Sequence, residues 1–162
     1  MRSYTVPSSL MVALALGVFS SPTLGSEAYC GKFELIGGAK TVTLIDEPPK
    51  GDSIGDVRTG TMDFTDPRTN DVVKVYFRSK IVAVGKDGVH TFRGDPVWVF
   101  PGGDRLFTAD LYHRTNDTRP RGIEEKIAEA VLGGTGAFAR VSGSIDGDAG
   151  DAPVYRFDLT CN

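Results

Sequence analysis

The chain has 162 residues, of which 40% are hydrophobic and 24% are charged, and its formal net charge is −3. These values are typical of one globular domain that buries a good share of its surface on folding. Acidic and basic residues are mixed along the chain, so it lacks the concentrated basic face that nucleic-acid binding requires. Glycine is frequent, with 20 residues, which indicates many turns and bulges instead of long helices.

Residues 1–28 are predicted to be a signal peptide. Arg2 supplies a positive charge, and the apolar stretch from Leu10 to Phe19 is too short to span a bilayer. Small residues just before Tyr29 favour cleavage there, and a site a few residues earlier is the alternative. We therefore expect a secreted protein, extracellular or periplasmic, with no membrane anchor and a single domain over residues 29–162.

The chain contains two cysteines, Cys30 near the predicted mature N-terminus and Cys161 at the penultimate position. In an oxidising compartment such a pair is expected to form a disulfide. The bond would close a loop over nearly the whole domain and, in the chain-entropy model, stabilise it by roughly 4–5 kcal/mol. It would also place the first and last strands side by side, as a closed barrel requires.

Turn-forming residues recur at short intervals after the leader and separate segments with strand character. Residues 72–84 illustrate the pattern, with Val73, Val75, Phe77 and Ile81 on one face and Lys74, Arg78 and Lys80 on the other. Regular strands without amphipathic helices between them favour a sandwich or a barrel. The predicted strands are Tyr29 to Ile36, Lys40 to Ile45, Asp56 to Phe64, Val72 to Val84, Val89 to Phe100, Arg105 to His113 and Val154 to Cys161.

One segment departs from this pattern. Residues 123–132 are rich in Glu, Ala, Lys and Ile, and Ile123, Ile127 and Val131 would share one face of a helix. Local propensity therefore predicts a helix here.

Three features resemble the allene oxide cyclase and dirigent barrel families over most of residues 30–161. The segment 133–138, Gly-Gly-Thr-Gly-Ala-Phe, is similar to a glycine-rich signature that these families carry between two late strands. Residues 51–56 leading into 60–64 are similar to their loop and third strand, and dirigent proteins also tie their ends by a disulfide. The resemblance implies an all-β domain, a single eight-stranded antiparallel barrel with its termini joined by a disulfide. It also implies that residues 123–132 form a strand.

The resemblance further implies that the lumen binds a small apolar or phenolic molecule and directs stereoselective cyclisation or coupling of a reactive intermediate. Asp63 falls near the first pocket aspartate of dirigent proteins, and Asp146 or Asp148 falls near the second. The glutamate of the cyclases is absent, because Leu44-Ile45-Asp46 stands at the corresponding stretch. The predicted catalytic residues are Asp63, Tyr76 and Asp146, and the predicted ligand-binding residues are Phe77, Phe92, Trp98 and Phe107.

A non-catalytic binding protein of lipocalin type is the main alternative, because it needs the same pocket without a titrating group. A buried carboxylate with a raised pKa in the lumen would favour the enzyme. The relatives form dimers or trimers through their barrel walls, so a homodimer or a homotrimer is a further expectation.

Other motifs carry less weight. Gly51-Asp52-Ser53-Ile54 together with Asp110 and His113 would provide the groups of a serine esterase, but no α/β pattern surrounds them. Residues 134–139 match a dinucleotide-binding pattern without the helix that it needs. No spacing indicates a metal site or a cofactor. Asn116 begins a formal glycosylation sequon.

Overall fold

The computed structural model describes residues 26–86, 88–115, 125–149 and 152–162. Most of the predicted signal peptide and the Asn116 sequon lie outside the described residues. Two short 3-10 helices, η1 (Ser26–Tyr29) and η2 (Gly136–Phe138), accompany the strands. The strands are β1 (Gly31–Ile45), β2 (Val57–Thr65), β3 (Val72–Val84), β4 (Val89–Gly94), β5 (Val97–Val99), β6 (Arg105–Thr115), β7 (Glu125–Gly134), β8 (Ser142–Ala149) and β9 (Val154–Thr160).

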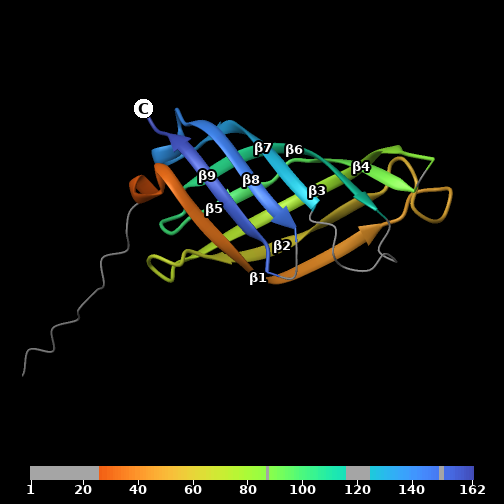
Figure 1. Cartoon of the computed structure of the whole chain (residues 1–162), viewed down its shortest axis with the longest axis horizontal. Coiled ribbons are helices and arrows are strands. Elements are labelled where there is room, and N and C mark those ends of the chain that lie inside the picture. Colours follow the sequence, from red (N-terminus) through yellow and green to blue (C-terminus); the bar gives the residue numbers. More distant parts are fainter. Residues whose placement is uncertain (1–25, 87, 116–124, 150–151) are drawn as a thin grey trace, which may run out of the picture.

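The strands form one closed antiparallel barrel (Figure 1). The order around the sheet is β2-β1-β9-β8-β7-β6-β4-β3-β5, and the pairing of β2 with β3 closes the wall. β4 and β5 share one position in that wall, because each pairs with β3 on one side and with β6 on the other. The prediction of an all-β, eight-stranded antiparallel barrel is therefore confirmed.

Side chains alternate between the interior and the outer face along each strand, as the pleat of a β-strand requires. On β3, Val73, Val75 and Ile81 are buried, whereas Arg78 and Lys80 are exposed, as predicted. Burial of the inward set is the main force that holds the wall together. The buried core cluster consists of Tyr29, Phe33, Leu35, Phe64, Val73, Val75, Trp98, Phe100, Leu106, Phe138, Val141, Ile145, Phe157 and Leu159.

Cys30 and Cys161 form the predicted disulfide, with their Cα atoms 5.8 Å apart. The bond lies beside the start of the β1–β9 pairing, where Gly31 is opposite Leu159. First and last strands are thus neighbours in the wall, and the covalent link fixes the seam between them. Disulfides of this kind are typical of proteins from oxidising compartments.

The end of the barrel that carries η1, η2 and the disulfide is filled with aromatic side chains, and we call it the closed end. Tyr29 is fully buried, and its ring centroid lies 5.4 Å from that of Phe33 and 4.8 Å from that of Phe100. Phe33 stacks on Phe157 at 4.5 Å, and Phe138 of η2 packs against Phe100 at 4.7 Å. This packing leaves the closed end solid.

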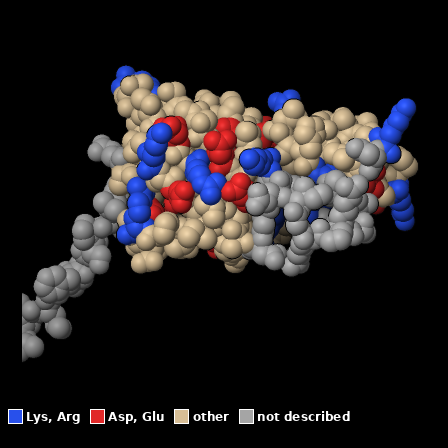
Figure 2. Space-filling model, viewed as in Figure 1, with Lys and Arg blue, Asp and Glu red and all other residues tan. Residues whose placement is uncertain are grey.

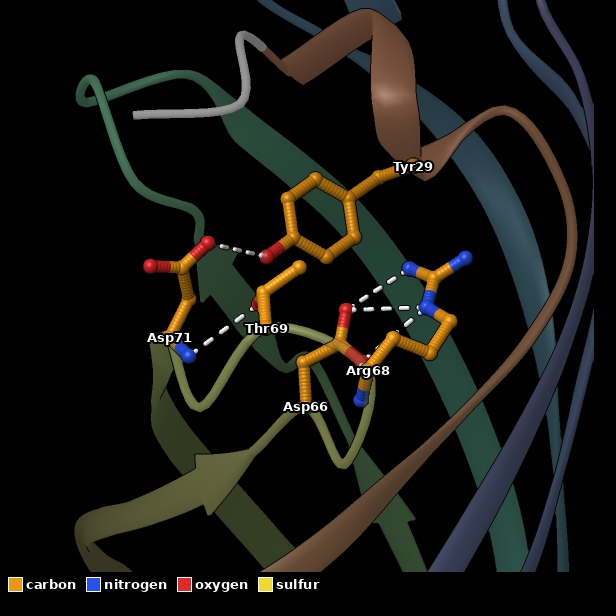
Figure 3. Close-up of polar contacts among 5 residues, drawn as sticks. All are labelled: Tyr29, Asp66, Arg68, Thr69 and Asp71. Atoms are coloured by element: carbon orange, nitrogen blue, oxygen red, sulfur yellow. Dashed lines mark hydrogen bonds and ion pairs between the residues drawn. The ribbon is translucent and has the colours of Figure 1, made fainter. Parts of the chain in front are cut away.

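The loop between β2 and β3 adds a polar cluster to the closed end (Figure 3). The buried Asp66 carboxylate accepts hydrogen bonds from Arg68 Nε at 3.0 and 3.1 Å and from Arg68 Nη2 at 2.7 Å. The Arg68 guanidinium lies over the rings of Tyr29 and Phe33, 5.6 and 5.2 Å from their centroids. The Tyr29 hydroxyl donates to Asp71 Oδ2 at 3.3 Å. The cluster therefore ties the loop to the aromatic core.

The glycine-rich segment 133–138 forms a tight turn between β7 and β8, at the place that the family resemblance implied. Gly136 has a φ of +56°, a conformation that favours glycine, and a Cβ there would overlap the Asp104 carboxylate. Asp104 in turn accepts a hydrogen bond from the backbone N–H of Ala137 at 3.0 Å. The turn therefore leads β7 through η2 into β8 at the closed end.

Three local predictions were wrong or incomplete. The helix expected over residues 123–132 is instead β7 in the part that the structure describes, because pairing with both β6 and β8 outweighs a weak local propensity. β1 is one strand with a bulge between Gly37 and Lys40, and not two strands. The single strand expected over residues 89–100 is interrupted between Gly94 and Val97, which separates β4 from β5.

Figure 2 shows the face of the barrel over β1, β9 and β8, where acidic and basic side chains are intermixed. Arg156 of β9 forms ion pairs with Glu34 of β1 at 3.1 Å and with Asp148 of β8 at 2.6 Å. Lys32 pairs with Asp158 at 3.3 Å. This outer face is therefore a solvated set of exposed cross-strand pairs, each of which contributes little to stability.

Candidate functional site

The half of the barrel opposite the closed end has inward-facing side chains that remain accessible to solvent, and we call the interior of this half the lumen. Met62 of β2 packs against the core and therefore faces inward. The register between β1 and β2 places Val42 and Leu44 of β1 on the same inner face. These two inward side chains are nevertheless 51% and 50% exposed. Inward residues at the closed end, such as Leu35, are fully buried. The barrel therefore opens at the far end.

Glu129 of β7 points into the lumen and is only 4% exposed. Its Oε2 accepts hydrogen bonds from Trp98 Nε1 at 3.0 Å and from Thr108 Oγ1 at 2.6 Å. Burial raises the pKa of Glu129 to about 7, the hydrogen bonds act in the opposite sense, and the charge of Asp110 raises it further. A carboxyl group with a pKa near neutrality can both donate and accept a proton at physiological pH.

Asp110 of β6 is the direct cross-strand partner of Glu129. Directly opposite residues of an antiparallel pair have Cβ atoms about 4.5–5.5 Å apart, so the two carboxyl groups occupy one patch of the wall. Burial raises the pKa of Asp110 to about 6, against the lowering effect of the Gly94 backbone N–H. One buried and one partly buried acid this close disfavour joint ionisation, so the pair retains a proton more readily than either acid alone.

The Asp110 carboxyl occupies a space that glycine leaves open. Its cross-strand partner on β4 is Gly94, and a Cβ at that position would overlap Asp110 Oδ1. This Oδ1 atom is buried and makes no hydrogen bond with any described residue. The fold thus provides room for a carboxyl oxygen whose hydrogen-bonding capacity the surrounding wall does not satisfy.

Aromatic side chains line the lumen around the two acids. The centroid of the Tyr155 ring lies 5.3 Å from that of the Trp98 ring and 5.1 Å from that of the Phe64 ring. These three rings separate the lumen from the closed end. Burial raises the pKa of Tyr155, and so do the charges of Glu129 and Asp110. Further along the lumen, Phe92 and Tyr112 stack at 5.0 Å. The site therefore combines closely packed aromatic rings with an acid pair of which Glu129 is buried and Asp110 is partly buried.

Basic side chains also face the lumen. The guanidinium of Arg58 lies 4.8 Å from the centroid of the Phe92 ring, and Lys40 Nζ lies 5.5 Å from that of Phe77. His90 is buried on the same face of β4 as Phe92, and its ring centroid is 6.4 Å from that of Phe92. Basic side chains from β1 and β2 therefore share the inner face of the barrel with the acid pair.

Three of the four predicted ligand-binding residues face the interior. Phe92 and Trp98 are almost fully buried, and Phe77 is partly buried against Gly60 of the neighbouring strand. Phe107 does not share this orientation, because it lies between the buried Leu106 and Thr108 on β6 and is 36% exposed on the outer face. Its aromatic ring is therefore outside the lumen.

The three predicted catalytic residues also lie on the outer face. Asp63 is between the inward Met62 and Phe64, and its carboxylate pairs with Lys74 Nζ at 3.1 Å. Tyr76 is 50% exposed, and Asp146 is exposed on β8. Asp148, the alternative to Asp146, pairs with Arg156 on the same outer face. The structure therefore brings none of these groups to the acid pair in the lumen.

The groups of the esterase alternative are not assembled either. The Ser53 hydroxyl donates to the Glu47 carbonyl at 3.3 Å and to Asp56 Oδ1 at 3.2 Å. His113 is hydrogen-bonded to Thr91 Oγ1 at 3.0 Å on the outer face, whereas Asp110 faces the lumen. No serine–histidine–aspartate arrangement results from these contacts.

Within the described ranges, no three His, Cys, Asp or Glu side chains gather as a metal site would require. In the same part of the chain, no helix has the length and apolarity to cross a membrane.

Sequence reasoning missed Glu129 as a site residue and considered Asp110 only for an esterase. In a helix over residues 123–132, Glu129 would lie away from the face that Ile127 and Val131 share. Had the segment been treated as a strand, alternation would have grouped Ile127, Glu129 and Val131 on one face, with alanines between them. An acid between two apolar inward positions is the signal that was available.

The comparisons with known proteins concern the fold. The barrel is similar to the solved structure of "Pyocyanin demethylase", with a TM-score of 0.64 and 17% sequence identity. The match covers 80% of this chain and 99% of that chain. No protein-family model matches the chain, and no curated protein matches its sequence. At this identity, the likeness establishes a shared barrel fold.

Proposed function

We propose that this protein is a secreted barrel that binds a small apolar or phenolic molecule in its lumen and directs stereoselective cyclisation or coupling of a reactive intermediate. The observation that carries the proposal is the buried Glu129, held by Trp98 and Thr108 with its pKa raised to about 7. A barrel that only stores its ligand does not need a titrating acid pair, and the burial of such groups costs free energy of folding.

Glu129 is proposed as the proton-transferring group. In its protonated form it donates a proton to an oxygen or carbon atom of the bound molecule. In its ionised form it takes a proton from another atom of that molecule, so the carboxyl returns to its starting state after an isomerising cyclisation. Asp110 keeps the pKa of Glu129 raised, because its own charge opposes ionisation of the neighbour.

The aromatic walls are proposed to hold one conformer of the intermediate. Stacking surfaces of Trp98, Tyr155 and Phe92 favour a flat or phenolic molecule. Holding the reacting atoms close together, in a space with little water, favours one stereochemical outcome. The name of the structural neighbour, pyocyanin demethylase, describes action on a small molecule, which is in keeping with this use of the fold.

We further propose that copies of the barrel associate through the outer wall as a homodimer or homotrimer. Tyr76 is opposite Val97, and Val97 is opposite Phe107, so the three form an apolar row across β3, β5 and β6. Tyr76, predicted as a catalytic residue, and Phe107, predicted as a ligand-binding residue, would then contribute to contacts between copies.

Trp98 fluorescence tests the proposal, because Trp98 is the only tryptophan of the chain and donates a hydrogen bond to Glu129. We expect its emission to titrate with a midpoint near the Glu129 pKa of about 7. Glu129→Gln should abolish this titration, and the matched outer-face variant Asp63→Asn should retain it. If the Trp98 emission of the wild type does not change between about pH 5 and about pH 9, the assignment is wrong.

The ligand itself is sought by native mass spectrometry of protein purified from its secreting host, compared with a denatured sample. A retained phenolic or apolar molecule that quenches Trp98 supports the proposal. If the Glu129→Gln variant binds that molecule and turns it over at the wild-type rate, the proton-transfer role is wrong and the storage alternative is favoured.

A further inference from the structure

A second concave surface lies on the outer face of the barrel, away from the lumen. It is a groove of about 460 Å³ over β3 and β4. Arg78, Lys80 and Arg93 line it with Ile54 and Val82, and Asp95 is the only acid among the described residues of the lining. The groove is therefore mainly basic, with an apolar wall beside the basic groups.

The arrangement of the three cations is unfavourable without a counter-charge. Lys80 of β3 is directly opposite Arg93 of β4, and like charges at directly opposite positions destabilise an antiparallel pair. Arg78 projects from the same face two residues before Lys80. Among the described residues, no carboxylate forms an ion pair with any of the three, Asp95 included. An anion seated between them would relieve the repulsion.

The apolar wall is held in place by a structured loop, residues 46–56. The buried Asp56 carboxylate accepts hydrogen bonds from the backbone N–H groups of Glu47 and Ser53, each at 2.8 Å. Two backbone hydrogen bonds dock the loop on β3, from Gly55 N–H to the Ile81 carbonyl at 3.0 Å and from Ile81 N–H to the Asp56 carbonyl at 2.9 Å.

The docked loop contains the Gly-Asp-Ser-Ile segment. The segment therefore has a structural role, which the esterase interpretation did not assign to it. Ile54 is 64% exposed at the groove, and Val82 is 40% exposed at the same groove. Two exposed apolar side chains thus stand next to a set of unneutralised cations. A ligand with an apolar portion beside its charge would cover both.

We propose that this groove is a binding site for an oxyanion head group, of phosphate, sulfate or carboxylate type, that carries a short apolar chain. Arg78 and Arg93 can each present two N–H donors to such a head group, and Lys80 adds a point charge between them. Ile54 and Val82 contact the chain. The site is independent of the proposed reaction in the lumen.

The test is a titration of ¹⁵N-labelled protein followed by amide NMR shifts, with hexyl phosphate as one probe and inorganic phosphate as the other, at constant ionic strength set with sodium chloride. We expect saturable shifts at Lys80, Val82 and Arg93 with hexyl phosphate. Lys80→Met and Arg93→Met should each weaken binding about tenfold, the loss of one charge-assisted contact. Lys74→Met is the matched control, because Lys74 lies on the same outer face of β3 but pairs with Asp63.

Ile54→Ser tests the apolar wall separately. It should reduce the affinity for hexyl phosphate to that for inorganic phosphate and leave the latter unchanged. Equal affinity of the wild type for the two probes would overturn the assignment of the apolar wall. Shifts that do not saturate, or that persist unchanged in both Lys80→Met and Arg93→Met, would overturn the site as a whole.

Discussion

The two halves of the barrel are built from the same strands but differ in how their inward-facing polar groups are paired. At the closed end, Tyr29, Phe33 and Phe100 pack ring against ring, and the buried Asp66 is satisfied by the Arg68 guanidinium. In the lumen, the buried Glu129 lies opposite the partly buried Asp110, and no basic side chain among the described residues forms an ion pair with either. Stability is therefore concentrated at one end, and groups that cost stability are concentrated at the other. Such a division is typical of proteins whose functional site is built on a rigid scaffold.

The largest expected effect comes from removing the covalent link at the closed end. The Cys30→Ser/Cys161→Ser double variant should lose about 4–5 kcal/mol of unfolding free energy, because the bond closes a loop with a sequence separation of 131. Urea unfolding measures the loss, and a reductant should lower wild-type stability by a similar amount while leaving the double variant unchanged. A loss below about 1 kcal/mol would contradict the view that the closed end carries the stability.

The next effect belongs to the lumen and depends on pH. Glu129 has a pKa of about 7 in the folded state and an ordinary value of 4.5, so between these values the folded state holds a proton that the unfolded state releases. Unfolding free energy should therefore fall as the pH rises from about 4.5 to about 7, by about 3 kcal/mol if Glu129 acts alone.

Glu129→Gln isolates this effect. The variant should lack most of the fall and be the more stable protein at pH 8. Urea unfolding at a series of pH values measures both proteins. An unchanged pH slope in Glu129→Gln would show that the fall arises elsewhere, with Asp110 as the first residue to examine, because its pKa is also raised.

Asp66 at the closed end should have the opposite pH dependence. Burial opposes its ionisation, but the hydrogen bonds and charge of Arg68 hold its pKa below its ordinary value of 3.8. Its contribution is therefore present above about pH 4 and lost as the pH falls below that value. Asp66→Asn should cost about 1–3 kcal/mol at pH 7, since Arg68 loses its buried partner. As the pH is lowered, the unfolding free energy of the variant should start from a lower value and decrease less steeply than that of the wild type.

The smallest effects are expected on the outer face. Asp63→Asn and Asp146→Asn should each change stability by less than about 1 kcal/mol, because exposed ion pairs and solvated carboxylates contribute little. Both variants should keep the pH titration of Trp98 fluorescence and the affinity for a lumen ligand. If either one abolishes turnover of an identified substrate, the catalytic role first predicted for these residues would stand and the lumen assignment would need revision.

Much of the fold could be predicted from the sequence, because it rests on strong and redundant signals. The alternation along residues 72–84, the glycine-rich turn at 133–138 and the paired cysteines each indicate the same closed barrel. The site could not be predicted as well, because the choice between lumen and outer face depends on a single residue of register. Asp63 and Tyr76 each have inward apolar neighbours on both sides, which was evidence for an outward orientation.

Glu129 was harder to recognise for a different reason. Its segment has the composition of a helix, and only pairing with β6 and β8 makes it a strand. The raised pKa then follows from burial opposite Asp110, a neighbour that is distant in sequence and known only from the register. Local propensity therefore failed at the place where tertiary structure creates the chemistry.

The solid closed end has a consequence for the traffic of molecules through the barrel. Tyr29, Phe138 and the loop of Asp66 close one end of the barrel, so the lumen is accessible from the other end only. In the proposed reaction, substrate and product would use the same open end of the barrel, so neither could pass the other. Release of the product would then precede every new entry, and accumulated product would compete directly with fresh substrate.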